Sequence, residues 1–131
     1  MTLHSNAGLL KGAYDAFAGG DIHPLLDLLS EEIVWVDSTL GPLAGAYHGK
    51  AEVPQFFGKM MDIYKGEFAI EVLDVLADDD YGVVLTRESG VVDGHRLSWT
   101  GVHQYSFEGG KVKRFDSFCS VEYQRFWSDR T

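Results

Sequence analysis

The sequence has only one cysteine, Cys119, among its 131 residues. A single thiol excludes an internal disulfide and any metal site built from several thiolates. The histidines show no HxH or HExxH spacing, so we expect no metal site. We interpret Cys119 as a small, buried apolar residue.

Positive charge is also scarce, with 11 Lys and Arg against 20 Asp and Glu and a formal net charge of -9. Such a surface repels nucleic-acid phosphates and anionic lipids. No apolar run approaches the roughly 18 residues of a membrane span. The start, MTLHSNAGLL, lacks the basic and apolar regions of a secretory signal. We therefore expect a cytoplasmic protein that binds neither nucleic acid nor membrane.

The common cofactor and nucleophile motifs are missing too. No GxGxxG follows a predicted strand, and neither GxxxxGK[ST] nor GxSxG occurs. We thus expect no cofactor. Repeats and Pro- or Gly-rich linkers are also missing, and 45% of residues are hydrophobic, as in globular proteins. We expect one domain over residues 1–131, with 122–131 as a C-terminal aromatic extension that covers a cavity mouth or enters a dimer contact.

Helices are predicted in the first half. Apolar residues recur at helical spacing over 6–18, Gly19 and Gly20 end that helix, and a leucine-rich second helix follows to form a hairpin. The segment 33–37 (IVWVD) alternates as a strand, and the Gly-rich segment 38–49 reads as a loop. A third helix over about 50–64 has a stripe of Phe, Met and Tyr, typical of a core or of an apolar ligand cavity.

The second half is predicted as strands over 68–77, 81–92, 95–108 and 111–121, in an antiparallel meander. Asp93-Gly94 and Gly109-Gly110 are strong hairpin signals. With 33–37 added, the sheet has about five strands. Helices first and sheet second indicate an α+β fold.

The last predicted hairpin carries two residues suited to acid–base chemistry, His103 and Asp116. If Gly109 and Gly110 form a two-residue loop, His103 faces Asp116 across the ladder. Both then lie on a sheet face with aromatic residues, which suggests the wall of a pocket. A purely structural hydrogen bond is the alternative for this pair.

The side of the sheet that Arg87 occupies depends on the preceding hairpin. A two-residue Asp93-Gly94 loop opposes Arg87 to Thr100 and turns it outward. A three-residue loop, 93–95, places Leu85 and Arg87 on the cavity face. We favour the second register, although a slip of one residue flips every side chain.

The arrangement resembles a known superfamily. The segment FAGGD, the WxD of Trp35 and Asp37, the third helix and the closing GGKVKRFDSF look like the cone-shaped fold of nuclear transport factor 2, ketosteroid isomerase, limonene epoxide hydrolase and SnoaL-like polyketide cyclases. The resemblance covers about residues 6–121. It implies a cone-shaped, curved antiparallel (mixed) sheet around an apolar cavity that the helices close, and a homodimer through the sheet.

The resemblance also implies roles for residues. Asp37 matches the proton-shuttling carboxylate of ketosteroid isomerase, and His103 matches the protonated Asp of its oxyanion hole. The tyrosine of that hole aligns with Ala13, one position from Tyr14.

Other family members imply a different base. Asp116 matches the carboxylate that SnoaL-like cyclases use to abstract a carbon-bound proton. Arg87 and Asp116 match two members of the Asp–Arg–Asp triad of limonene epoxide hydrolase, but the third position is Ser89, which is not a carboxylate.

These observations favour a cofactor-independent isomerase or cyclase that moves a proton next to a carbonyl in a small apolar or aromatic molecule. Asp116 or Asp37 would be the base, and His103, Tyr14 or Arg87 would steady the enolate oxygen. The alternatives are a non-catalytic ligand-binding or protein-interaction domain, and water addition. For Asp37, a turn-initiating role is a further alternative. The expected substrate-binding residues are Phe17, Trp35, Phe56, Phe57, Met60, Met61, Tyr64, Leu85, Trp99, Tyr105 and Phe118.

Overall fold

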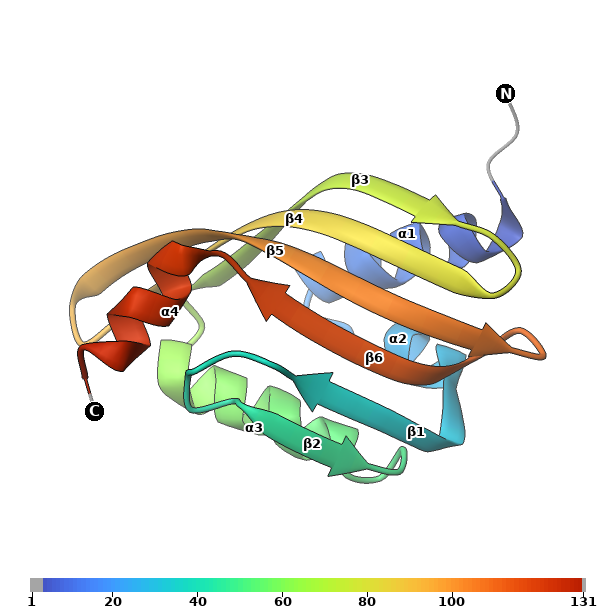
Figure 1. Ribbon diagram of the computed structural model, residues 1–131, viewed down its shortest axis with the longest axis horizontal. Coiled ribbons are helices and arrows are strands. Elements are labelled where there is room, and N and C mark those ends of the chain that lie inside the picture. The colour runs from blue at the N-terminus through green and yellow to red at the C-terminus, as the bar shows by residue number, and fades with distance from the viewer. Residues whose placement is uncertain (1–3, 131) are drawn as a thin grey trace.

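Helices pack on one face of a curved six-stranded sheet in the computed structural model, which describes residues 4–130 (Figure 1). The strand order is β2-β1-β6-β5-β4-β3, and only the β1–β6 pair is parallel. The expected α+β fold is confirmed. The elements are α1 (Ser5–Ala18), α2 (His23–Leu28), β1 (Leu29–Asp37), β2 (Gly45–His48), α3 (Val53–Tyr64), β3 (Phe68–Ala77), β4 (Tyr81–Val92), β5 (His95–Glu108), β6 (Lys111–Cys119) and α4 (Val121–Ser128).

The predicted helix hairpin is formed by α1 and α2. The His4 side chain caps α1 by accepting from the backbone N–H of Asn6, and Gly20, at φ 89°, lets the chain turn. Pro24 lies in the first turn of α2, where its missing N–H costs no helical hydrogen bond. The hairpin lies behind the sheet in the view of Figure 1.

Part of the predicted loop 38–49 is a strand, so that expectation was wrong. β2 pairs antiparallel with β1, and Trp35 lies opposite Tyr47, whose ring is buried. Gly45 enters the strand at φ 129°, a conformation that residues with a Cβ rarely adopt. The sheet therefore has one strand more than expected, at the edge beside α3.

The Asp93-Gly94 hairpin has the two-residue loop, so the favoured three-residue register was wrong. Val92 pairs with His95, and Asp93 and Gly94 both have positive φ, as a type I′ turn requires. Arg87 lies opposite Thr100, faces outward and forms a 3.4 Å ion pair with Glu71.

The last hairpin contains a β-bulge that overturns the predicted His103–Asp116 pair. Ser106 pairs with Arg114 while Phe107 pairs with Val112, so Lys113 is the extra residue. Beyond it the register shifts by one, and His103 lies opposite Ser117. Every later side chain on β6 consequently faces the other way from the prediction.

The core lies between the inner face of the sheet and helices α1 and α3. Its centre is a stack of Trp35 on Phe115, with ring centroids 3.7 Å apart. The expected aromatic extension forms α4, in which Tyr123 is buried against Trp99 at 4.9 Å between centroids. Within residues 4–130, no helix has the length and apolar character needed to cross a membrane.

Candidate functional site

A pocket of about 70 Å³ opens between the inner face of the sheet and helices α1 and α3. At roughly 10–15 Å³ per water, this is space for about five to seven water molecules. Eleven of the predicted site residues line it: Tyr14, Phe17, Trp35, Asp37, Phe56, Phe57, Met60, Tyr64, Trp99, His103 and Tyr105. The lining also includes Glu88, Phe115, Ser117 and Cys119, which the sequence analysis had not placed there.

Five predicted site residues lie elsewhere, and those predictions are corrected. Asp116 points to the outer face, where Arg114 donates to its two oxygens at 2.8 and 3.0 Å. Phe118 and Leu85 follow it to the outer face because of the shifted registers, and Phe118 is 43% exposed. Met61 is 57% exposed on α3, and Arg87 is paired with Glu71.

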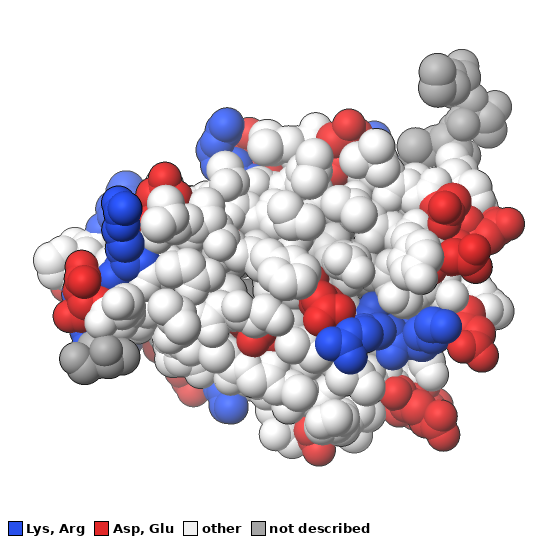
Figure 2. Space-filling view, viewed as in Figure 1, with Lys and Arg blue, Asp and Glu red and all other residues white. Residues whose placement is uncertain are grey.

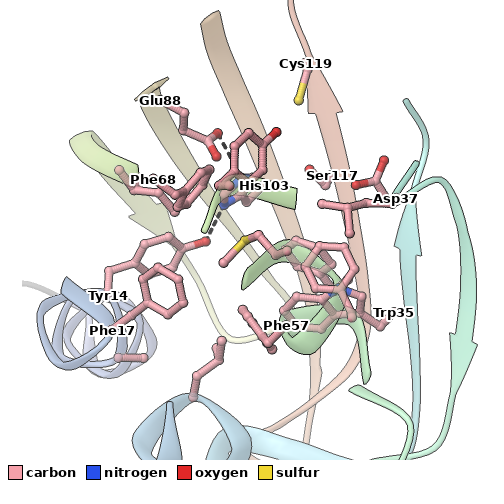
Figure 3. Close-up of a pocket in the computed structure, with 18 of the residues that line it drawn as sticks. Tyr14, Phe17, Trp35, Asp37, Phe57, Phe68, Glu88, His103, Ser117 and Cys119 are labelled. Atoms are coloured by element: carbon pink, nitrogen blue, oxygen red, sulfur yellow. Dashed lines mark hydrogen bonds and ion pairs between the residues drawn. The ribbon is translucent and has the colours of Figure 1, made fainter. Parts of the chain in front are cut away.

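A chain of hydrogen-bonding side chains runs along the inner face (Figure 3). The Tyr14 hydroxyl lies 2.5 Å from His103 Nδ1 and 2.6 Å from the Tyr105 hydroxyl. On the other side of the imidazole, His103 Nε2 lies 3.4 Å from Glu88 Oε2. Thr86 donates to the same carboxylate oxygen at 2.7 Å. The imidazole is thus held from both sides.

Glu88 is the main pocket residue that was not predicted from the sequence. It alternates with Arg87, so the wrong hairpin register placed it outside. The Asp-Gly dipeptide, the strongest signal for a two-residue loop, was the clue that would have found it. Gly101 then leaves the room for its carboxylate, because a Cβ there would overlap Glu88 Oε2.

The groups that surround the Glu88 carboxyl favour its ionised form. Burial by itself raises the pKa of the carboxyl, but the hydrogen bond and charge of His103 and the Thr86 hydroxyl outweigh it and lower the pKa. Burial raises the pKa of Tyr14 and of Tyr105, so both phenols keep their protons. With a proton on Nε2 facing Glu88, Nδ1 of a neutral imidazole accepts from Tyr14, whereas an imidazolium donates to it.

Asp37 lies on the opposite side of the pocket from Tyr14, at the end of β1 (Figure 3). Its Oδ1 accepts from the backbone N–H of Thr39 at 3.0 Å and from the Thr39 hydroxyl. Among the described residues, Oδ2 has no hydrogen-bond partner and is left for the pocket. Burial raises the pKa of Asp37, although the Thr39 donors and His103 oppose the rise.

Asp37, Ser117 and His103 form one row across three neighbouring strands. Adjacent strands lie about 4.8 Å apart, so the backbones of Asp37 and His103 are about 10 Å apart. The small Ser117 side chain between them leaves a gap. The carboxylate and the imidazole therefore face the same space from two sides.

The sulfur of Cys119 also borders the pocket, half-buried rather than fully buried as expected. Burial raises the pKa of this thiol, so it stays protonated at neutral pH. Within residues 4–130, no three His, Cys, Asp or Glu side chains group closely enough to hold a metal ion.

A curved mixed sheet that helices close over an apolar pocket defines the nuclear transport factor 2-like, or ketosteroid isomerase-like, class of folds. The chain belongs to the SnoaL-like domain family, whose model matches residues 10–115. No curated protein matches it significantly.

Solved structures share the whole fold. Bal32a, from a soil-derived mobile gene cassette, is 26% identical with a TM-score of 0.84, and the match covers 93% of this chain and 95% of Bal32a. TerC, co-crystallised with polyporic acid, is 18% identical (TM-score 0.79; 95% and 98% covered). A protein with a ketosteroid isomerase-like fold from Catenulispora acidiphila, in complex with trimethylamine, is 11% identical (TM-score 0.74; 92% and 92% covered).

Proposed function

We propose that this protein is a cofactor-independent enzyme that moves a proton next to a carbonyl group in a small, largely apolar molecule, as isomerases and cyclases do. The observation that carries the proposal is Oδ2 of Asp37, which has no hydrogen-bond partner among residues 4–130 and borders the same pocket as the Tyr14–His103 pair. A base and an oxygen-binding group are thus held on two sides of one apolar space.

In this proposal Asp37 is the base. A buried carboxylate with a raised pKa holds an abstracted proton more strongly than an exposed one, which suits it to carbon acids. Oδ2 would take the proton from the carbon beside the carbonyl and return it to another carbon. The Thr39 donors bind Oδ1, so Oδ2 is the oxygen that would contact the substrate.

Tyr14 would bind the carbonyl oxygen. Its own oxygen lies within hydrogen-bond distance of both Tyr105 and His103. If both donate to it, the Tyr14 proton is free to be donated to the substrate, and the bond strengthens as negative charge develops on the enolate. Glu88 supports this arrangement, because its carboxylate oxygen lies 3.4 Å from Nε2 of His103 and holds the ring with Nδ1 toward Tyr14.

Two proteins of the same fold were crystallised with small organic molecules. TerC was crystallised with polyporic acid and the Catenulispora acidiphila protein with trimethylamine. We propose that this protein also binds a small organic molecule.

The test is turnover of a panel of enones and dienones by Asp37→Asn and Tyr14→Phe variants. Loss of a general base is expected to lower turnover by about 10²–10⁴-fold. Asp116→Asn is the matched control, because its carboxylate lies on the outer face. Unchanged turnover in both pocket variants would remove the proposal.

Ligand binding without catalysis is the second candidate. The aromatic wall of the pocket favours it, because an apolar pocket binds apolar molecules whether or not they react. If a ligand from the panel binds unchanged for hours in the wild-type protein, this second function holds.

We also propose a homodimer through the sheet. The outer face carries neighbouring apolar side chains on β3, β4, β5 and β6, and Figure 2 shows that this face has few charges across its middle. Exposed patches of this kind are typical of interfaces. The patch consists of Leu76, Val83, Leu85, Val102 and Phe118.

A further inference from the structure

The formal charges that line the pocket are negative. Asp37 and Glu88 both contribute carboxylates, and among the described residues no Lys or Arg lines it. His103 is the one lining group that gains a positive charge on protonation, and it already faces Glu88. An anionic ligand would therefore enter a site that repels it.

Each carboxylate has one oxygen without a hydrogen-bond partner among residues 4–130. Oδ1 of Asp37 and Oε2 of Glu88 hold all their bonds, which leaves Asp37 Oδ2 and Glu88 Oε1. Both residues are only 6% exposed. Burying negative charge without a full set of partners is unfavourable, so a ligand that brings positive charge gains from both groups.

The remaining walls suit the rest of such a ligand. Trp35, Phe57, Tyr64 and Trp99 line the pocket with aromatic rings. The faces of aromatic rings carry negative electrostatic potential and attract organic cations. A cation whose charge is spread over alkyl groups meets both the rings and the carboxylates.

We propose that the pocket selects small organic cations, amines that are protonated or quaternary and carry short alkyl groups, over neutral and anionic molecules of the same shape. The inference rests on the pocket of the proposed function but not on turnover. If the protein is also an enzyme, the substrate class is an amino-carbonyl compound, whose positive charge stabilises the enolate.

The test uses three water-soluble probes of nearly the same shape: choline, 3,3-dimethylbutan-1-ol and 3,3-dimethylbutanoate. Calorimetric or NMR titrations at pH 7 give the affinity of each. Choline is expected to bind at least tenfold tighter than the alcohol, and the alcohol at least tenfold tighter than the carboxylate. Equal affinities, tightest binding of the carboxylate, or no binding of any probe at millimolar concentration would overturn the inference.

Variants of the two pocket carboxylates test whether the preference for choline arises in this pocket. Asp37→Asn and Glu88→Gln keep the shapes and remove one charge each, so each is expected to lower choline affinity severalfold and leave alcohol affinity unchanged. Unchanged binding of the alcohol thereby shows that each variant is folded. Asp116→Asn, on the outer face, should change neither. If both pocket variants retain the full preference for choline, the cation binds elsewhere and the inference fails.

The outcomes separate this inference from the proposed function. A preference for choline without turnover of any carbonyl compound leaves a cation-binding protein. Turnover of neutral enones without a preference for choline supports the proposed enzyme and overturns the inference of cation selectivity.

Discussion

Gly101 provides the space in which the carboxylate of Glu88 lies. Glu88 pairs with Trp99, two residues before Gly101 on the same strand face, and its side chain extends past Gly101 to reach His103. A Cβ at position 101 would overlap Glu88 Oε2 and stand 2.6 Å from Thr86 Oγ1. The contact that holds the imidazole therefore depends on a missing methyl group two residues away.

Gly101→Ala is expected to push Glu88 away from His103. Overpacking of a filled site costs about 1–3 kcal/mol, and the free energy of unfolding in urea measures it. The NMR signals of the His103 ring should shift at the same time, because its Nε2 loses its partner.

Gly12→Ala is the matched control. A Cβ at position 12 in α1 meets nothing within 4 Å. Alanine is favoured over glycine within a helix by about 0.5–1 kcal/mol, so this variant should be more stable than the wild type. If Gly101→Ala is as stable as Gly12→Ala and leaves the His103 signals in place, the steric argument is wrong.

The two pocket carboxylates should respond to pH with opposite signs, and Asp37 is the first. Burial raises its pKa above the ordinary 3.8, so ionisation costs stability as pH rises from 3.8 through the folded-state value. Asp37→Asn removes this cost and keeps the acceptor for Thr39. Its stability relative to the wild type should be higher at pH 7 than at pH 3.5, as urea unfolding would measure. A relative stability that falls with rising pH would contradict the assignment.

Glu88 should behave in the opposite way. The pKa is lowered despite burial, so the ionised carboxylate stabilises the fold above the ordinary 4.5, and that contribution is lost as pH falls through the folded-state value. Glu88→Gln should lower the free energy of unfolding at pH 7 by about 1.5–3 kcal/mol, the typical contribution of a hydrogen bond to a charged group. The deficit should shrink in acid. An equal deficit at pH 3.5 and pH 7 would show that shape, not charge, is responsible.

Most of the fold could be predicted from sequence because it depends on strong local signals. The spacing of apolar residues identified three of the four helices in residues 4–130, all but α4, and turn residues separated the four strands of the meander. β2 was missed because its four residues, GAYH, carry one buried side chain and follow a Gly-rich segment. Its pairing with β1 is a tertiary contact that no local pattern specifies.

The site was predicted less well, because a change of one residue in register moves a side chain to the other face. Because of the bulge at Lys113, Ser117 faces the pocket instead of the predicted Asp116. Because of the two-residue loop, Glu88 faces the pocket instead of the predicted Arg87. The β6 sequence held a clue to the bulge. Its buried Val112 and Phe115 are three residues apart, a spacing that no regular strand has. Tyr14, Asp37 and His103 precede these irregularities or lie outside them, and they lie in the pocket.

The outer sheet patch predicts a dimer that one charge would break. The wild-type protein should show about twice the 14.6 kDa mass of the chain in light scattering at micromolar concentration. Phe118→Asp places an unpaired charge among Val102 and Leu85 in the patch, and should give a monomer because burying that charge is unfavourable.

Leu40→Asp is the control for this variant. Leu40 is also exposed, but it follows β1 outside the sheet, so its substitution should leave the dimer intact. Leu40→Asp should unfold at a urea concentration close to that of the wild type, and Phe118→Asp should still unfold cooperatively as a folded monomer, since neither side chain is in the core. A wild-type monomer, or a Phe118→Asp dimer, would contradict an interface on this face of the sheet.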